Sequence, residues 1–225
     1  MKHLLFSALL MAAFAGLSAQ SADPVVKPVN YLLEEEKLAR DVYLTFKDQY
    51  KLQVFSNIST SEQQHLDWMI DLAKQKGLTI PPAVIKDQRG DFTDPSLVVL
   101  YKKLTDQGKN SLADALKAGA LIEETDIADL DNAMTNATGE ELNLYRRLRM
   151  ASENHLRAFV KNLNAQGVEY QPTVLAAADY DLIVSGDNQG GGGACCSGMQ
   201  GNNQGKGKGK KAGKNGSGGG CCKSK

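Results

Sequence analysis

The stretch of sequence that decides the fold is residues 59–66, Ser-Thr-Ser-Glu-Gln-Gln-His-Leu. Glu62 and His65 are three residues apart, so on an α-helix they lie on the same face. A carboxylate oxygen and an imidazole nitrogen at this spacing can bind one metal ion together. Ser59 followed by Glu62 also has the spacing of a capping box, which predicts that a helix begins here and ends at Gly77. The stretch therefore predicts a helix that carries part of a metal site.

Apolar residues at helical spacing predict three more long helices, over residues 30–49, 111–134 and 138–165. Asn30 is the expected N-cap of the first, and Thr138 begins a second capping box that opens the last.

The remaining segments are shorter. Asp94 followed by Pro95 predicts a short helix. Pro81, Pro82 and residues 87–90 are expected to be loop, and residues 170–184 an extended segment with one short helix. No strand pattern of useful length is present. The predicted fold is all-α, a four-helix bundle with a long connection between helices two and three.

Each predicted long helix offers a metal ligand to the interior. Dimetal sites in helical bundles use Glu from two helices and Glu-x-x-His from the other two. Here the first helix offers Glu36, the third Glu123 and the fourth His155. The position three residues before His155 is Ser152 rather than Glu. Asp126, one turn after Glu123, is an alternative carboxylate.

Three segments also resemble known proteins. Residues 36–43, Glu-Lys-Leu-Ala-Arg-Asp-Val-Tyr, look like the first metal helix of rubrerythrins and other ferritin-like proteins. Together with residues 122–127 and 152–159 they resemble more closely an uncharacterised ferritin-like family, domain of unknown function 2202, over about residues 29–184. The resemblance implies a ferritin-like four-helix bundle without an established biochemical activity. By position, five residues match ferritin-like ligands: Glu36, Glu62, His65, Glu123 and His155.

A carboxylate and imidazole ligand set favours one or two transition-metal ions, iron first and other transition metals as alternatives. The expected chemistry is oxidation of ferrous iron or reduction of peroxide, with oxygen or peroxide as the partner. The other acids of these helices are expected to be solvated or on the surface: Glu34, Glu35, Glu124, Asp129 and Asp131.

Two alternatives stay open. In one, the histidines are core residues hydrogen-bonded to the glutamates without a metal, and nearby arginines neutralise the carboxylates: Arg40, Arg147 and Arg149. In the other, the chain is a non-catalytic envelope or surface scaffold whose C-terminal tail makes the contacts.

The N-terminus has the features of a secretory signal peptide over residues 1–22. Lys2 and His3 precede an apolar run at residues 4–17, and small residues follow it. The run is shorter than a membrane span, and no later segment is long and apolar enough to be one. The expected location is secreted or periplasmic, with no transmembrane segment after signal removal.

The C-terminal residues 186–225 differ in composition from the predicted domain at residues 23–185. They contain seven lysines and one acid, whereas the domain contains 18 basic and 25 acidic residues. The Gly-rich tail cannot bury a core and is predicted to be disordered. The acidic domain argues against a specific nucleic-acid partner, while the basic tail suits contact with anionic surfaces.

All four cysteines lie in this tail, where they could form disulfides or bind a soft metal ion: Cys195, Cys196, Cys221 and Cys222. A homo-oligomer is compatible with the sequence.

Overall fold

The computed structural model describes residues 26–186, and this part of the chain forms seven helices and no strand. The prediction of an all-α fold is confirmed. The predicted signal peptide and the tail beyond Gly186 lie outside the described residues. The helices are α1 (Val29–Tyr50), α2 (Gln53–Gln75), α3 (Pro82–Lys86), α4 (Pro95–Gly108), α5 (Leu112–Met134), α6 (Gly139–Asn164) and α7 (Ala177–Ser185).

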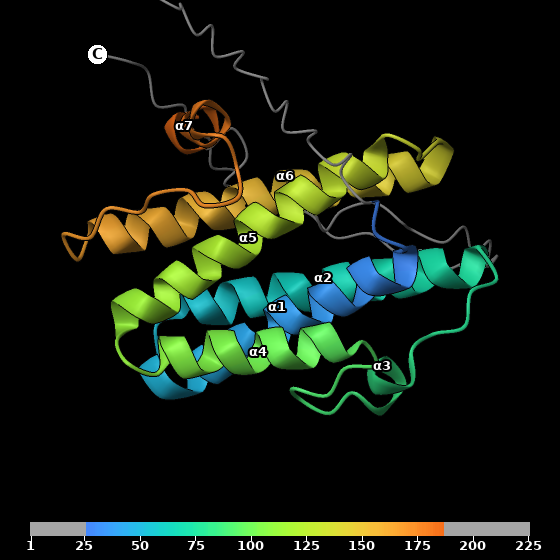
Figure 1. Cartoon of the computed structure of the whole chain (residues 1–225), viewed down its shortest axis with the longest axis horizontal. Helices are drawn as coiled ribbons and strands as arrows, with labels where there is room; N and C mark the ends of the chain where they lie inside the picture. Colours follow the sequence, from blue (N-terminus) through green and yellow to red (C-terminus); the bar gives the residue numbers. More distant parts are fainter. Residues whose placement is uncertain (1–25, 187–225) are drawn as a thin grey trace, which may run out of the picture. The chain divides into compact units, whose positions relative to one another are not determined.

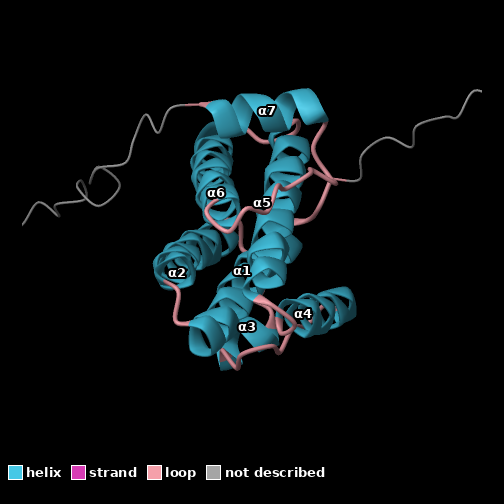
Figure 2. Ribbon diagram, turned by 90° about the vertical axis from the view of Figure 1, so that its left-hand side faces the viewer, coloured by secondary structure: helices cyan, strands magenta, loops and turns pink. Residues whose placement is uncertain are grey.

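The long helices form two antiparallel hairpins, α1 with α2 and α5 with α6 (Figure 1). The hairpins face each other, because α1 also contacts α5 and α2 contacts α6. α4 packs against α1 and α5, and α7 packs against α6 (Figure 2). Gly119 permits the close approach of α5 and α6, since a Cβ atom there would lie 2.6 Å from Cε1 of Phe159.

The apolar core is divided into two clusters by a layer of polar side chains. One cluster includes Phe46, Phe55 and Phe159, and the other includes Met69 and Leu148. Along α1, α2 and α6, the polar residues of the predicted site lie between stretches that belong to the two clusters. On α5, Glu123 lies between Ile122 and Ile127 of the first cluster, and the second cluster begins at Leu130. The fold therefore places a polar layer in the middle of an apolar interior.

α1 is the most enclosed helix. Every residue from Leu32 to Tyr43 is buried, because α2, α4 and α5 all pack against this helix. Among residues 26–186, no helix has both the length and the hydropathy needed to cross a bilayer.

Two predicted helix starts are wrong. α1 begins at Val29, and the Asn30 side chain donates a hydrogen bond to the carbonyl of Thr79 instead of capping the helix. α2 begins at Gln53, and Ser59 donates to the carbonyl of Ser56 from within the helix. The hairpin turn between α1 and α2 is only two residues long, so α2 starts well before the capping-box residues.

Other boundaries follow the sequence more closely. Asp94 caps α4 by accepting a hydrogen bond from the N–H of Ser96 at 2.8 Å. Thr138 is the N-cap residue of α6, as predicted, but its side chain forms no capping hydrogen bond. The five-residue helix α3 lies between the two predicted loop segments and includes Pro82, which was predicted as loop but starts the helix at a position favourable for proline.

Candidate metal centre

Four helices bring Glu and His side chains together in the polar layer. α1 contributes Glu36, α2 contributes Glu62 and His65, α5 contributes Glu123 and α6 contributes His155. These five predicted residues form two groups of three, and each group has ligand atoms within 4.8 Å of one another. Glu62 belongs to both groups, so one carboxylate links two potential metal positions.

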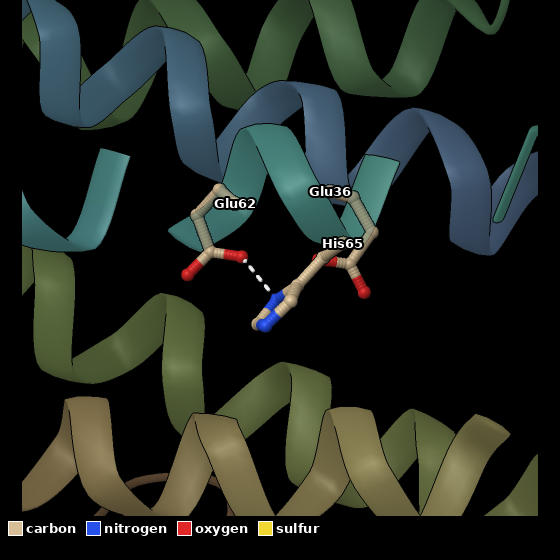
Figure 3. Close-up of side chains that lie close together, drawn as sticks. All are labelled: Glu36, Glu62 and His65. Carbon is tan, nitrogen blue, oxygen red and sulfur yellow. Dashed lines mark hydrogen bonds and ion pairs between the residues drawn. The ribbon is translucent and has the colours of Figure 1, made fainter. Parts of the chain in front are cut away.

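The first group consists of Glu36, Glu62 and His65 (Figure 3). Nδ1 of His65 is 2.8 Å from Oε2 of Glu62, to which it is hydrogen-bonded, and 3.3 Å from Oε2 of Glu36. All three side chains are buried. At this position, the hydrogen bond within the Glu-x-x-His motif already occupies Nδ1 of His65.

The second group consists of Glu62, Glu123 and His155. Nδ1 of His155 is 2.8 Å from Oε1 of Glu62 and 3.4 Å from Oε2 of Glu123. Neither contact has the alignment of a hydrogen bond, so these three buried atoms have no hydrogen-bond partner. Buried polar atoms are almost always satisfied. Three convergent orphaned ligand atoms therefore fit a bound cation.

Ser61 lies between the two histidine rings. Its Oγ is 3.3 Å from Nε2 of His65 and 3.2 Å from Nε2 of His155. Both Nδ1 atoms face the carboxylates while both Nε2 atoms face one hydroxyl. In metal sites, the hydrogen bond at the other ring nitrogen fixes the tautomer and the ring orientation. The sequence analysis missed Ser61, although it is four residues before His65 and thus on the same face of α2.

Tyr43 supports the opposite side of the site. Its hydroxyl donates a hydrogen bond of 2.7 Å to Oε1 of Glu123, which leaves Oε2 of Glu123 directed toward His155. Tyr43 is fully buried and packs against the ring of Phe159, with the ring centroids 5.2 Å apart. It therefore fixes which carboxylate oxygen is available as a ligand.

Asp126 and Ser152 are both buried but belong to neither group of three. Asp126 lies one turn after Glu123 on α5, and Ser152 lies one turn before His155 on α6. The predicted alternative carboxylate is thus near the site rather than among its convergent ligand atoms. Among the described residues, neither group of three contains a carboxylate that takes the place of the one missing at Ser152.

Burial and mutual repulsion shape the protonation of the cluster. Burial raises the pKa of Glu36 to about 7. Burial also raises the pKa of Glu123, and with the neighbouring carboxylates it raises that of Asp126 well above its usual value. The carboxylates outweigh the effect of burial on the histidines, so the pKa of His155 rises to about 10 and that of His65 is also raised.

Glu62 responds in the opposite direction. Although burial opposes ionisation, the flanking charges of His65 and His155 hold the pKa of Glu62 below its ordinary value. Without a metal ion, two imidazolium groups therefore neutralise the shared carboxylate. A cation would have to displace those protons to bind.

The ion pairs do not support the alternative in which arginines neutralise the carboxylates of the centre. Arg40 pairs with Asp41 and Asp87, and Arg147 lies over the ring of Trp68. Arg149 pairs with two carboxylates outside the cluster, those of Asp131 and Glu153. None of the three makes an ion pair with a carboxylate of the candidate centre.

The prediction that Glu34, Glu35 and Glu124 are solvated is also wrong, because all three are buried. Glu34 accepts hydrogen bonds from the backbone N–H groups of Thr93 and Asp94. Glu124 accepts from backbone N–H groups at residues 173–175 and from the hydroxyl of Tyr170. These carboxylates hold distant segments rather than a metal. Asp131 is exposed and Asp129 is half-buried.

Residues 26–187 match the model of a family described as "Uncharacterized protein domain (DUF2202)". The chain belongs to this family. The uncharacterised protein MJ0754 of Methanocaldococcus jannaschii is 44% identical over 157 residues, which are 69% of this chain and 84% of that protein. The crystal structure of hypothetical protein MJ0754 from Methanococcus jannaschii DSM 2661 has a TM-score of 0.69 and 39% identity, and covers 76% of this chain and 100% of that one. These matches agree with the resemblance seen in the sequence.

Proposed function

We propose that the chain is an exported ferritin-like protein that binds one or two transition-metal ions, iron first, between its two helical hairpins. In this proposal α1, α2, α5 and α6 are the four helices of the bundle, and α3 and α4 belong to the long connection between the second and third. The antiparallel pairing of α1 with α2 and of α5 with α6 supports it.

One observation carries the metal proposal. Oε1 of Glu62, Oε2 of Glu123 and Nδ1 of His155 converge in the interior, and none has a hydrogen-bond partner. A buried polar group left unsatisfied costs roughly 1–3 kcal/mol. Without a metal, a protonated His155 offsets part of this cost through its 2.8 Å contact with Glu62, and a metal ion in place of that proton would give all three atoms a partner. A mixed oxygen and nitrogen donor set suits iron and other first-row transition metals.

The two positions are unequal. The position at His155 has orphaned ligand atoms, whereas Nδ1 of His65 is already hydrogen-bonded to Glu62. We expect the first ion to bind at the Glu62, Glu123 and His155 position. The second position has no second bridging carboxylate, because Ser152 stands where the paired motif would have Glu.

The reaction class in this proposal is oxidation of ferrous iron by oxygen or peroxide, or reduction of peroxide. Bound ferrous iron would supply the electrons, and the oxygen or peroxide would accept them. The chain's own residues hold the site in place. Glu62 gives negative charge to both positions, Tyr43 orients Glu123, and Ser61 orients both histidine rings. The apolar clusters on both sides exclude bulk water from this layer.

The test is a metal titration with a matched pair of variants. Purified full-length chain is loaded with ferrous iron without oxygen, and bound metal is then quantified. We expect one to two ions per chain, and near-complete loss in Glu62→Gln, since Glu62 serves both positions. Glu140→Gln makes the same change on the exposed surface of α6 and should leave binding intact.

Stability gives a second measurement. A ligand that binds only the folded state stabilises it by about 2.7 kcal/mol at a concentration 100 times its Kd, so chelation should lower the melting temperature. If wild-type and Glu62→Gln proteins bind equally little iron and melt alike with and without chelator, the metal proposal fails. The scaffold alternative would then be favoured.

Export is a separate part of the proposal and rests on the signal-like features of residues 1–22. Mass spectrometry of the protein recovered from its host should show a mature chain that begins near residue 23. An intact N-terminus in the cytoplasmic fraction would contradict export.

A further inference from the structure

A cavity of about 100 Å³ lies between α1, α4 and α5, beside the candidate metal centre but outside its ligand groups. Most of its wall is aliphatic, from Leu38, Leu100, Leu104, Leu121 and Ile122. A cavity of this size is larger than one water molecule needs, while an engineered apolar cavity of about 150 Å³ binds benzene. It can therefore hold a ligand of about four or five non-hydrogen atoms.

Two carboxyl groups line the same cavity, those of Glu35 and Asp126. Each residue is 7% exposed. Within residues 26–186, the Asp126 side chain has no hydrogen-bond or ion-pair partner, and Oε2 of Glu35 has no hydrogen-bond partner. No Lys, Arg or His is among the residues that line the cavity.

We propose that this cavity binds a small organic cation, an alkylammonium ion of about three or four carbons. Its ammonium group would donate hydrogen bonds to the carboxyl groups of Asp126 and Glu35, and its alkyl chain would lie among the leucines. Oε2 of Glu35 is buried without a hydrogen-bond partner, which is costly. An ammonium has three N–H donors to offer to this oxygen and to the carboxyl of Asp126.

The lining disfavours the other classes of small ligand. An anion would face the two wall carboxyls, with no Lys, Arg or His on the wall to pair with it. A hydrated metal ion would lose part of its hydration shell in this cavity, and the five aliphatic side chains would offer no polar contacts in return. A fully apolar ligand would leave the carboxyl of Asp126 without a partner.

Calorimetric titration of the full-length, metal-free chain with methyl- to hexylammonium tests the proposal. Affinity should rise about fourfold per added methylene up to propyl- or butylammonium and then fall when the cavity is full. Propanol should bind at least tenfold more weakly than propylammonium, and propionate should not bind. Equal or tighter binding of propanol or propionate, or no binding of any amine at millimolar concentration, would overturn the proposal.

Variants locate the bound amine. Asp126→Asn should weaken propylammonium binding at least tenfold, and Leu121→Phe should weaken it by filling the cavity. Asp131→Asn on α5 and Val99→Phe on α4 change exposed positions and serve as matched controls. Circular dichroism confirms that each variant is folded. Unchanged affinity in folded Asp126→Asn would contradict the assignment.

The cavity and the metal centre are separable. Glu62→Gln, which removes the shared ligand of the metal centre, should still bind propylammonium. If that variant loses the amine, the ammonium lies at the metal centre and the cavity assignment is wrong. If it keeps the amine while wild-type protein binds no iron, the metal proposal alone fails.

Discussion

Ser61 shows how much of the candidate centre depends on a residue that is not a ligand. Its hydroxyl is within hydrogen-bond distance of Nε2 of both His65 and His155. One oxygen can accept from both rings when both carry a proton on Nε2. When a cation replaces the Nδ1 protons, Ser61 can therefore keep both rings oriented with Nδ1 toward the carboxylates.

The substitution Ser61→Ala tests this role. Loss of a hydrogen-bond partner of a metal-bound histidine typically lowers metal affinity 10–100-fold, and we expect about tenfold or more here. Folding should change little, because Ser61 is only half-buried. Iron titration followed by circular dichroism measures both effects. Thr60→Ala, at the adjacent exposed position, is the control, and equal affinities in the two variants would exclude the role.

Ser152→Glu tests the departure from the paired motif. A Glu there would complete a second Glu-x-x-His with His155, and it should raise the iron stoichiometry or affinity by adding negative charge next to the cations. Without iron, the added buried carboxyl should destabilise the fold. Parallel iron titrations and thermal melts separate these effects. A variant that loses stability and gains no metal would exclude a dimetal centre at this layer.

At the residue scale, sequence spacing predicted which Glu and His side chains meet better than it predicted their surroundings. Glu62 and His65 share a helix face by geometry alone, and the structure brings them together with Glu36, Glu123 and His155. Glu34 is buried because its carboxylate accepts a hydrogen bond from the backbone N–H of Thr93, 59 residues away. Pairings over that distance leave no local periodicity in the sequence.

At the scale of elements, α1 uses buried charges to hold the segment that follows α3. Lys37 pairs with Asp41 at 2.6 Å and also donates to the carbonyl of Gln88. Asp41 accepts from the N–H of Gly90 at 3.0 Å, and Arg40 joins the same network. These groups satisfy one another, so the loop between α3 and α4 is attached to the centre of the molecule.

Asp41→Asn should therefore be strongly destabilising. It leaves the fully buried ammonium of Lys37 without its charged partner, and breaking a buried ion pair in this way costs about 3–5 kcal/mol. Denaturant unfolding measures the loss. Asp106→Asn on α4, whose ion pairs are exposed, should unfold like wild type. A loss in Asp41→Asn no larger than in that control would mean that the network adds little.

Glu124 performs a similar task for the segment before α7. Its carboxylate accepts backbone hydrogen bonds of 3.0, 2.9 and 3.0 Å from Thr173, Val174 and Leu175. Such a cluster of N–H donors around one carboxylate orders the segment without secondary structure.

Glu124→Gln should loosen this segment. Hydrogen bonds to a charged group contribute about 1.5–3 kcal/mol each, and the neutral amide keeps only part of that. We expect faster cleavage by limited proteolysis within residues 168–186 and a loss of about 2 kcal/mol in unfolding free energy. Glu169→Gln, at an exposed position of the same segment, is the control. Identical cleavage rates would contradict the anchoring role.

Helix positions were predictable and helix starts were less so. The stripes on α5 and α6 were identified from their period, and Tyr145, Leu148, Ser152 and Phe159 are all buried as it required. The capping-box rule failed at α2, because the start of that helix is set by the two-residue turn after α1. The capping preferences of the residues around Ser59 carry no information about the geometry of the preceding hairpin turn.

At the scale of the whole molecule, the five residues of the candidate centre lie on the described helices α1, α2, α5 and α6. Deletion of residues 187–225 should therefore leave both helicity and iron stoichiometry unchanged. Circular dichroism and metal analysis of the truncated chain measure these properties. Loss of all iron on truncation would indicate that the metal is bound by the tail cysteines rather than by the helices.

The enclosure of α1 has a consequence for how this sequence can drift during evolution. An amphipathic helix tolerates substitution along its solvated side, so neutral changes accumulate there with a period near 3.6 residues. The stretch from Leu32 to Tyr43 has no such side, since all twelve of its residues are buried. Neutral drift should therefore be suppressed at every position of this stretch, and α1 should retain its ancestral sequence as an unbroken block while the surfaces of α4 and α6 diverge.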